Sequence, residues 1–412
     1  MKKILISSAL LAGVLSYAGG FKVSLQGVKQ LAMAHTSAHA EDASVGFFNP
    51  AGISFIPSKL SIVAGGFGAK SEVEFQNVST MTTTKTDNPI GTPIYAAVAY
   101  KISPTVSAGF SFTTPYGNTV QWPNNWQGSE IIEKLELKSY FFQPMLSVKL
   151  APWISLGGSY IYVKGKVDWT QAISSLNGSL NLYNDKASGS GYSFGFYMQP
   201  DSDWDVSISY RSPIDMKADP GTATFNISPA LYSNPKLNIP ASGKDNFSAV
   251  LPLAEEFMLG VSYKVTPKWM LSADFNYQGW SKYSKLVLDF EHATVGNTSD
   301  PTIKSIPKKF QNSKVFRVGS QYMITDKFAG RVGYYWDESP YSDQNWIPDT
   351  PSFNAHVITG GFGYKFGRLG IDAAASYTFG DARKVENSYY NLIGQARAKV
   401  LTFGLGLSYN AF

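Results

Sequence analysis

The chain of 412 residues contains no cysteine. This absence excludes disulfide bonds, thiolate metal sites and a cysteine nucleophile. Lysine and arginine form no basic run and the formal net charge is only +5, so the sequence carries no sign of nucleic-acid binding. It also holds no ATP-binding motif, and we expect no cofactor.

Long apolar runs are missing as well. Every hydrophobic stretch after residue 18 is interrupted within a few positions by a polar residue, glycine or proline, so we expect no transmembrane helix there. Charged residues make up 16% of the chain, whereas globular domains average about 25%. The chain is instead rich in aromatic residues, with 26 Phe, 24 Tyr and 9 Trp. This composition is typical of a membrane β-barrel with aromatic girdles.

The first 18 residues have the pattern of a secretory signal peptide. Lys2 and Lys3 form a short basic region, residues 4–15 are apolar, and Ser16 and Ala18 occupy the small-residue positions before a cleavage site. A membrane-spanning helix needs about 20 apolar residues, and this run is too short. We therefore expect export, with residues 1–18 removed.

Several segments alternate with a period of two, the mark of a strand with two different faces. One face is apolar and aromatic, and the other is small or polar. The apolar positions in three such segments are Phe328, Val332, Tyr334 and Trp336; Ile371, Ala373, Tyr377 and Phe379; and Leu401, Phe403, Leu405 and Leu407. In a membrane barrel the apolar face would contact lipid and the other face would line the lumen.

Short turn signals separate these strands on one side, and longer polar stretches separate them on the other. The short signals are Ser103-Pro104, Ala151-Pro152, Asp201-Ser202, Thr266-Pro267, Thr325-Asp326 and Gly367-Arg368. Outer-membrane barrels have short periplasmic turns and long outer loops. Counting outward from the turns gives fourteen strands, with 171–187 predicted as one of the long loops. The sequence thus predicts an all-β fold, a fourteen-stranded antiparallel transmembrane β-barrel.

The segment "QGVKQLAMAHTSAHAEDASVGFFNPAG", residues 26–52, resembles the hatch of the FadL family of outer-membrane transporters of long-chain fatty acids and hydrophobic compounds. Residues 113–128, 209–219, 331–340 and 347–367 are similar to further family segments in the same order. The resemblance implies location in the bacterial outer membrane, a hatch (plug) over residues 19–58 and a barrel over residues 59–412. The short, polar stretch 171–187 departs from the family pattern.

The sequence before the first strand contains a rigid turn, Asn49-Pro50-Ala51-Gly52, directly after Phe47 and Phe48. The residues alone allow either a plain turn that leads into the first strand or a plug inside the lumen. The resemblance favours the plug. It makes these six positions the predicted gating residues, with Phe47 and Phe48 set against an apolar pocket.

Three arginines, Arg211, Arg317 and Arg331, have the parity of the lumen face. An arginine that faces lipid at the midplane costs about 2–4 kcal/mol, which enforces this orientation. A guanidinium in an apolar cavity can hold a carboxylate with two hydrogen bonds, so we predict ligand contacts at these residues. The alternative is pairing within the barrel, because Glu256, Asp274 and Asp372 also have inward parity.

The long stretch 115–137 contains an apolar cluster that includes Trp122, Trp126, Ile131 and Leu135. Such a cluster in an outer loop indicates either capture of a hydrophobic ligand or loop–loop packing that caps the barrel. The spacing of Ile131 and Leu135 is compatible with a short amphipathic helix. Gly109, in the third predicted strand, is a candidate for a lateral opening.

Taken together, the residues and the resemblance predict a monomeric, non-enzymatic channel for passive uptake of long-chain fatty acids. Its expected partners are a hydrophobic small molecule and outer-membrane lipid, and no nucleic acid. Three alternatives remain: uptake of aromatic hydrocarbons, a general porin, and an outer-membrane phospholipase. No metal site is expected, because His35 and His39 lack a third ligand. No lipase-type catalytic site is expected at His356, because no nucleophile lies beside it in the sequence.

Overall fold

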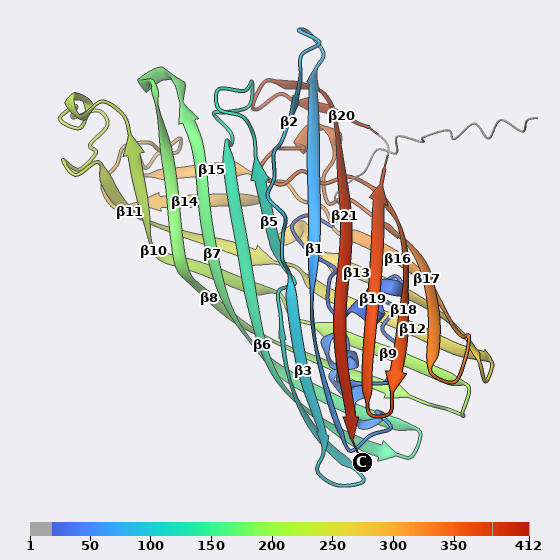
Figure 1. Ribbon diagram of the computed structural model, residues 1–412. Helices are drawn as coiled ribbons and strands as arrows, with labels where there is room; N and C mark the ends of the chain where they lie inside the picture. The colour runs from blue at the N-terminus through green and yellow to red at the C-terminus, as the bar shows by residue number, and fades with distance from the viewer. Residues whose placement is uncertain (1–18, 381, 412) are drawn as a thin grey trace, which may run out of the picture.

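A single antiparallel sheet closes on itself to form the barrel (Figure 1). The computed structural model describes residues 19–380 and 382–411, so the predicted signal peptide lies outside the described residues. Strand β1 (Leu60–Asn77) pairs with β21 (Leu392–Ala411) along its whole length and with β3 (Ile94–Lys101) on its other side. The first and last strands therefore join and close the sheet.

The wall has fourteen positions, as the sequence predicts. Seven positions hold two strands in tandem (β2/β3, β4/β5, β9/β10, β11/β12, β13/β14, β15/β16 and β19/β20), which accounts for the 21 strands of the sheet. The remaining strands are β2 (Thr83–Lys85), β4 (Val106–Thr113), β5 (Gly117–Gln121), β6 (Lys134–Ala151), β7 (Ile154–Ile173), β8 (Gly178–Met198), β9 (Trp204–Arg211), β10 (Ile214–Asn226), β11 (Lys244–Leu253), β12 (Glu255–Thr266), β13 (Trp269–Gly279), β14 (Lys285–Phe290), β15 (Ile303–Pro307), β16 (Ser313–Met323), β17 (Phe328–Asp337), β18 (Ala355–Phe366), β19 (Leu369–Phe379) and β20 (Arg383–Asn387).

The two faces of the wall follow the predicted alternation. On β21 the side chain of Leu405 is 68% exposed on the outside, whereas Thr402 is 3% exposed and points inward.

All six predicted short turns join neighbouring strands at one end of the barrel, here called the short-turn end. At one of them Gly367 has φ +62°, a left-handed conformation that glycine adopts without strain.

The prediction of a loop at 171–187 is wrong. Strand β7 continues to Ile173 and β8 begins at Gly178, so only a tight connection with the 3-10 turn η3 (Ser174–Leu176) separates them. Leu180 and Leu182 are buried on the inner face, and Asn181 between them is more exposed. The hairpin extends at the long-loop end, where an outward face meets water and need not be apolar, so its sequence looks like a loop.

Residues 19–58, here called the N-terminal segment, lie inside the barrel and appear in blue in Figure 1. The helix α1 (Val28–Ala32) packs against β18, β19 and β21, and the 3-10 helix η2 (Pro50–Ser54) packs against β6, β7 and β8. Further short helices are η1 (Ala43–Phe47), η4 (Pro229–Leu231), η5 (Trp280–Lys282) and η6 (Asp343–Asn345). Within residues 19–380 and 382–411, no helix is long and apolar enough to cross a membrane.

Candidate functional site

The predicted turn at Asn49 is fixed to the barrel wall by a fully buried amide. The Asn49 Oδ1 accepts a hydrogen bond from the backbone N–H of Ala51 at 2.9 Å and so caps η2. The Nδ2 group donates to the carbonyl oxygens of Phe196 at 2.8 Å and Ile208 at 3.2 Å, and to the Ser207 hydroxyl at 3.0 Å. The side chain therefore joins the N-terminal segment to β8 and β9.

Glycine on the inner wall lets the turn come this close. A Cβ atom at Gly157 would lie 2.5 Å from the Ala51 Cα, and one at Gly195 would lie 2.5 Å from the Asn49 Oδ1, both far inside contact distance. The carbonyl oxygen of Ala51 accepts hydrogen bonds from the hydroxyls of Ser147 at 2.9 Å and Ser155 at 2.8 Å. Two wall strands, β6 and β7, thus hold the carbonyl group of Ala51, which is the arrangement of an anchor.

The two phenylalanines before the turn are buried inside the barrel. The ring of Phe47 lies 5.6 Å from that of Tyr95 and 6.5 Å from that of Phe48, in edge-on arrangements. Gly52 lies against Val45 and Tyr197. Neither phenylalanine lines the cavities described below, and the gating role of residues 47–52 stays a prediction.

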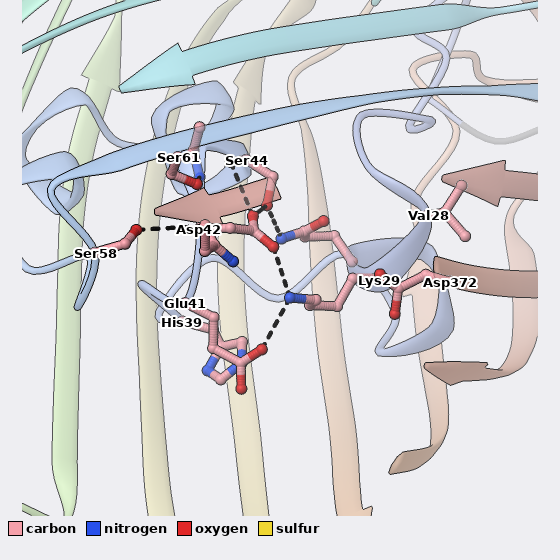
Figure 2. A network of polar contacts seen from close by, with 12 residues as sticks. Val28, Lys29, His39, Glu41, Asp42, Ser44, Ser58, Ser61 and Asp372 are labelled. Carbon is pink, nitrogen blue, oxygen red and sulfur yellow. Dashed lines mark hydrogen bonds and ion pairs between the residues drawn. The ribbon is translucent and has the colours of Figure 1, made fainter. Parts of the chain in front are cut away.

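A network of charged side chains holds the first half of the segment together (Figure 2). The Lys29 Nζ lies 2.6 Å from an oxygen of Asp42 and 2.8 Å from an oxygen of Glu41. The Ser61 hydroxyl of β1 accepts the backbone N–H of Ala43 at 2.9 Å. Burial raises the pKa of Asp42, but the attraction of Lys29 outweighs burial, and the pKa lies below its usual value. Asp42 is therefore ionised and paired at neutral pH.

The three predicted arginines all point into the lumen and are buried. Arg211 donates to the carbonyl oxygen of Phe47 at 2.9 Å and lies 3.3 Å from an oxygen of Glu256. Arg331 lies 2.6 Å from an oxygen of Asp372. Both therefore pair within the chain, with two of the three carboxylates that the sequence offered as possible partners.

Arg317 makes weaker contacts. It donates to the carbonyl oxygen of His35 at 3.4 Å, and its guanidinium lies 5.8 Å from the centre of the Tyr335 ring. Asp274, its possible partner, accepts instead the backbone N–H of Ser37 at 2.8 Å. Burial and the positive charge of Arg317 lower the pKa of His35 well below its usual value, so this histidine is neutral. Ligand contact by any of the three arginines stays a prediction.

An apolar cavity lies beneath the long loops, and we call it the loop cavity. It measures about 70 Å³ and is bounded by Phe21 from the N-terminal segment and by inward-facing aliphatic and aromatic side chains, including Leu182, Phe247 and Leu288. Asp349 is the only carboxylate in its lining. A ligand that enters it would meet an almost wholly apolar surface.

A buried lysine, which was not predicted from the sequence, lies next to the Asp349 carboxylate. Lys308 forms an ion pair with Asp349, and both side chains are almost fully buried. The Lys308 Nζ lies 5.2 Å from the centre of the Trp169 ring and 5.9 Å from that of the Tyr283 ring. Lys308 directly follows β15, where no local pattern marks it. Only the folded loops bring it to the cavity.

The predicted aromatic cluster of the outer loop forms a cap over the lumen. Trp122 and Trp126 stack with ring centres 4.1 Å apart, and their indole N–H groups donate to the carbonyl oxygens of Pro348 and Ile132. The helix expected near Ile131 is wrong, because that residue lies in a turn and Leu135 belongs to β6. Of the four predicted residues only Leu135 lines the loop cavity. Burial of the others fits loop–loop packing, and their role in ligand capture stays a prediction.

A second cavity, here called the wall cavity, passes through the barrel wall beside β1. It measures about 430 Å³, within the usual range of about 300–1,000 Å³ for ligand sites. Its lining includes inward-facing residues of the wall, such as Leu137 and Thr402, and outward-facing ones, such as Tyr140 and Ile94. The cavity therefore reaches from the lumen to the outer surface.

The gap exists because the chain between β4 and β5 turns inward. Tyr116 is buried and forms a β-bridge with Lys22 of the N-terminal segment instead of with the wall on that side. Gly109, predicted as the opening, pairs regularly with Ala99 on β3 and Met145 on β6. The interruption thus lies beyond Gly109, at 114–116.

Residues 21–25 separate the two cavities. Phe21 lines the loop cavity, and Lys22, Val23, Ser24 and Leu25 line the wall cavity. The Lys22 Nζ lies 2.6 Å from an oxygen of Glu256 on β12, which ties this part of the segment to the wall. We call residues 21–25 the strap. A molecule in the loop cavity can reach the wall cavity only if the strap moves.

Comparison with known proteins agrees with this architecture. The long-chain fatty acid transport protein of Escherichia coli (strain K12) is 27% identical over 227 residues, which cover 54% of this chain and 48% of that protein. The chain thus spans about half the length of the curated relatives it matches first.

Two solved structures have the same fold. A FadL homologue of Pseudomonas aeruginosa superimposes with a TM-score of 0.81 at 19% identity, covering 96% of this chain and all of that one. The toluene transporter TbuX of Ralstonia pickettii gives a TM-score of 0.69 at 14% identity, covering 94% and 98%.

The match to a protein family extends over residues 9–411. That family comprises transport proteins, which fits the expectation of a non-enzyme. The barrel is closed, with charged side chains inside and an apolar outer face, as in outer-membrane proteins. The chain is therefore an outer-membrane protein. The chain belongs to the outer membrane protein transport protein family (OMPP1/FadL/TodX).

Proposed function

We propose that this barrel carries long-chain fatty acids passively across the outer membrane. The observation that carries the proposal is the loop cavity, whose lining is mostly apolar and includes Asp349, which forms an ion pair with the buried Lys308. An alkyl chain matches the apolar lining, and a carboxylate matches the buried ammonium group. In the proposed complex the ligand carboxylate lies beside Lys308 and replaces part of its contact with Asp349.

The loop cavity must widen to take such a ligand, because 70 Å³ is well below the usual volume of a ligand site. Phe21 is the part of its boundary that belongs to the N-terminal segment rather than to the wall. Its displacement would enlarge the cavity and open the strap toward the wall cavity. The ligand would then leave sideways into the membrane through the gap at 114–116, as a hatch-gated mechanism requires.

A second candidate cargo is an aromatic hydrocarbon, because the fold is shared with a toluene transporter and the loop cavity is apolar. The two cargoes make different demands on Lys308. A hydrocarbon has no charge to pair with it, so uptake of a hydrocarbon would not need the lysine.

Uptake of oleate and of toluene by a host that lacks its own transporter tests both proposals. The double variant Lys308→Met with Asp349→Leu removes the ion pair without leaving one buried charge unpaired. We expect oleate uptake to fall at least tenfold and toluene uptake to change little. Lys236→Met, on an exposed loop, is the control. Equal oleate uptake by the double variant and the wild type would refute the role of Lys308, and failure of the wild type to take up oleate would refute the cargo itself.

Two further measurements separate this function from other classes. Steady, large ion conductance in planar bilayers would indicate a porin instead. Hydrolysis of phospholipid that a single serine substitution abolishes would indicate a phospholipase.

A further inference from the structure

A third cavity lies at the short-turn end, below helix α1, and we call it the rim cavity. It measures about 350 Å³ and is bounded by the turn between β16 and β17, the turn between β18 and β19, the end of β21 and the N-terminal segment. It lies on the other side of α1 from the wall cavity. On β21 the wall cavity includes Thr402 and the rim cavity includes Ser408, while Val28 of α1 packs against Gly404 and Gly406 between them.

Positive charge dominates the lining of the rim cavity. Five basic side chains line it: Lys29, Lys327, Arg331, Lys365 and Arg368. Its only lining carboxylates are Glu41 and Asp372. Asp42 also contacts Lys29 and raises the number of nearby acidic groups to three, and the four lysine and arginine side chains other than Arg368 still outnumber them.

The carboxylates are already engaged at the inner end of the cavity. Glu41 pairs with Lys29 (Figure 2), and Asp372 pairs with Arg331. Lys29 and Arg331 are both buried. At the outer end, Lys327 and Lys365 form no ion pair within the described part of the chain. The side chains of Lys327 and Lys365 are exposed and line the same cavity, so solvent screens their mutual repulsion, and an anion bound between them would be attracted by both charges.

We propose that the rim cavity is a binding site for an oxyanion, a carboxylate or phosphate group, that enters from the periplasmic side. Lys327 and Lys365 attract the anion, and the buried Arg331 and Lys29 form the inner end of the site. The site is distinct from the loop cavity and does not depend on which cargo the barrel carries. The same chemistry can come from free phosphate or from the headgroup of an anionic lipid at the inner rim.

Binding of inorganic phosphate to the purified full chain in an uncharged detergent at low ionic strength tests the site. The test variant is Lys327→Gln with Lys365→Gln. The matched control is Lys264→Gln with Lys268→Gln, which removes two lysines at another short turn outside the cavity. Titration calorimetry gives the affinity, and near-ultraviolet circular dichroism confirms that each variant is folded.

We expect saturable binding of one phosphate, weakened about tenfold in the test variant and unchanged in the control, and weakened for all proteins by added salt. Absence of saturable binding, or equal affinity of the wild type and the test variant, would overturn the proposal. Repeating the titration in nanodiscs identifies the source. Competition by phosphatidylglycerol but not by phosphatidylcholine assigns the site to a lipid headgroup, and equal affinity in both assigns it to a free anion.

Discussion

Removal of the Asn49 side chain should release the turn at residues 49–52 from the barrel wall. In Asn49→Ala the cap of η2 is lost, which typically costs about 1 kcal/mol. Two wall carbonyl groups and the Ser207 hydroxyl also lose a buried donor, and each such loss costs on the order of 1 kcal/mol or more. Together these losses should destabilise the seated turn by roughly 3 kcal/mol.

Hydrogen exchange followed by mass spectrometry measures this loss directly. A decrease of roughly 3 kcal/mol in the free energy of local opening speeds amide exchange by roughly 100-fold. We expect this acceleration in peptides that cover residues 43–56. Peptides from β18 and β19 should keep their protection, because their backbone ladders do not depend on the turn. Asn226→Ala, which removes one 3.3 Å contact on an exposed strand end, is the control.

An acceleration of less than threefold in residues 43–56 would refute the reasoning, since it would mean that the four contacts of Asn49 do not hold the turn. Loss of protection throughout the barrel would refute it in another way. That result would show the turn to be part of the cooperative wall rather than a separately seated element.

Three further predictions follow from the same packing. Gly157→Ala should prevent close seating of the turn and speed exchange at residues 49–55, while the neighbouring Gly158→Ala, whose Cβ meets nothing closer than 3.9 Å, should not. The ion pairs of Glu41 and Asp42, whose pKa values are depressed in the fold, should stabilise the segment above the ordinary values of 4.5 and 3.8 and fail as the pH falls through the depressed ones. A nitroxide label on the segment should therefore become mobile only in strong acid, and mobility that changes between pH 6 and 8 would contradict the pairing. In this cysteine-free chain a disulfide between Ser54→Cys and Ser147→Cys, whose hydroxyl oxygens lie 2.7 Å apart, should leave oleate uptake unchanged, because the contacts of Asn49 and Ala51 already fasten the turn to the wall. Inhibition that a reductant reverses would instead support the gating role of residues 47–52.

Most of the wall could be predicted from the sequence because alternate residues of each strand face lipid and the lumen, and the two environments select different residue types. Leu401, Phe403 and Leu405 face outward as their period predicts, and the six short turns carry their own turn residues. The hairpin at 171–187 was missed because its outward face meets water and its polar residues resemble a loop. The expected helix near Ile131 failed because a spacing of four residues also fits a turn followed by a strand.

The candidate sites were less predictable because they depend on residues that only the fold brings together. Inward parity placed Arg211 and Arg331 correctly, but parity alone could not decide between a ligand and the carboxylates of Glu256 and Asp372. Nothing local marks Lys308, which only the fold brings to Asp349 in the lining of the loop cavity. The gap in the wall arises from pairing between Tyr116 and Lys22, residues 94 positions apart in the chain.

The central claim is that a hydrophobic ligand binds inside the barrel in the loop cavity. Crystals grown with 12-bromododecanoate test it, because anomalous scattering locates the bromine atom at the end of the alkyl chain. The account predicts a bromine peak among Leu182, Phe247 and Leu288, with Phe21 displaced and the carboxylate beside Lys308. Bromine peaks only on the lipid-facing surface, with Phe21 unmoved, would contradict it.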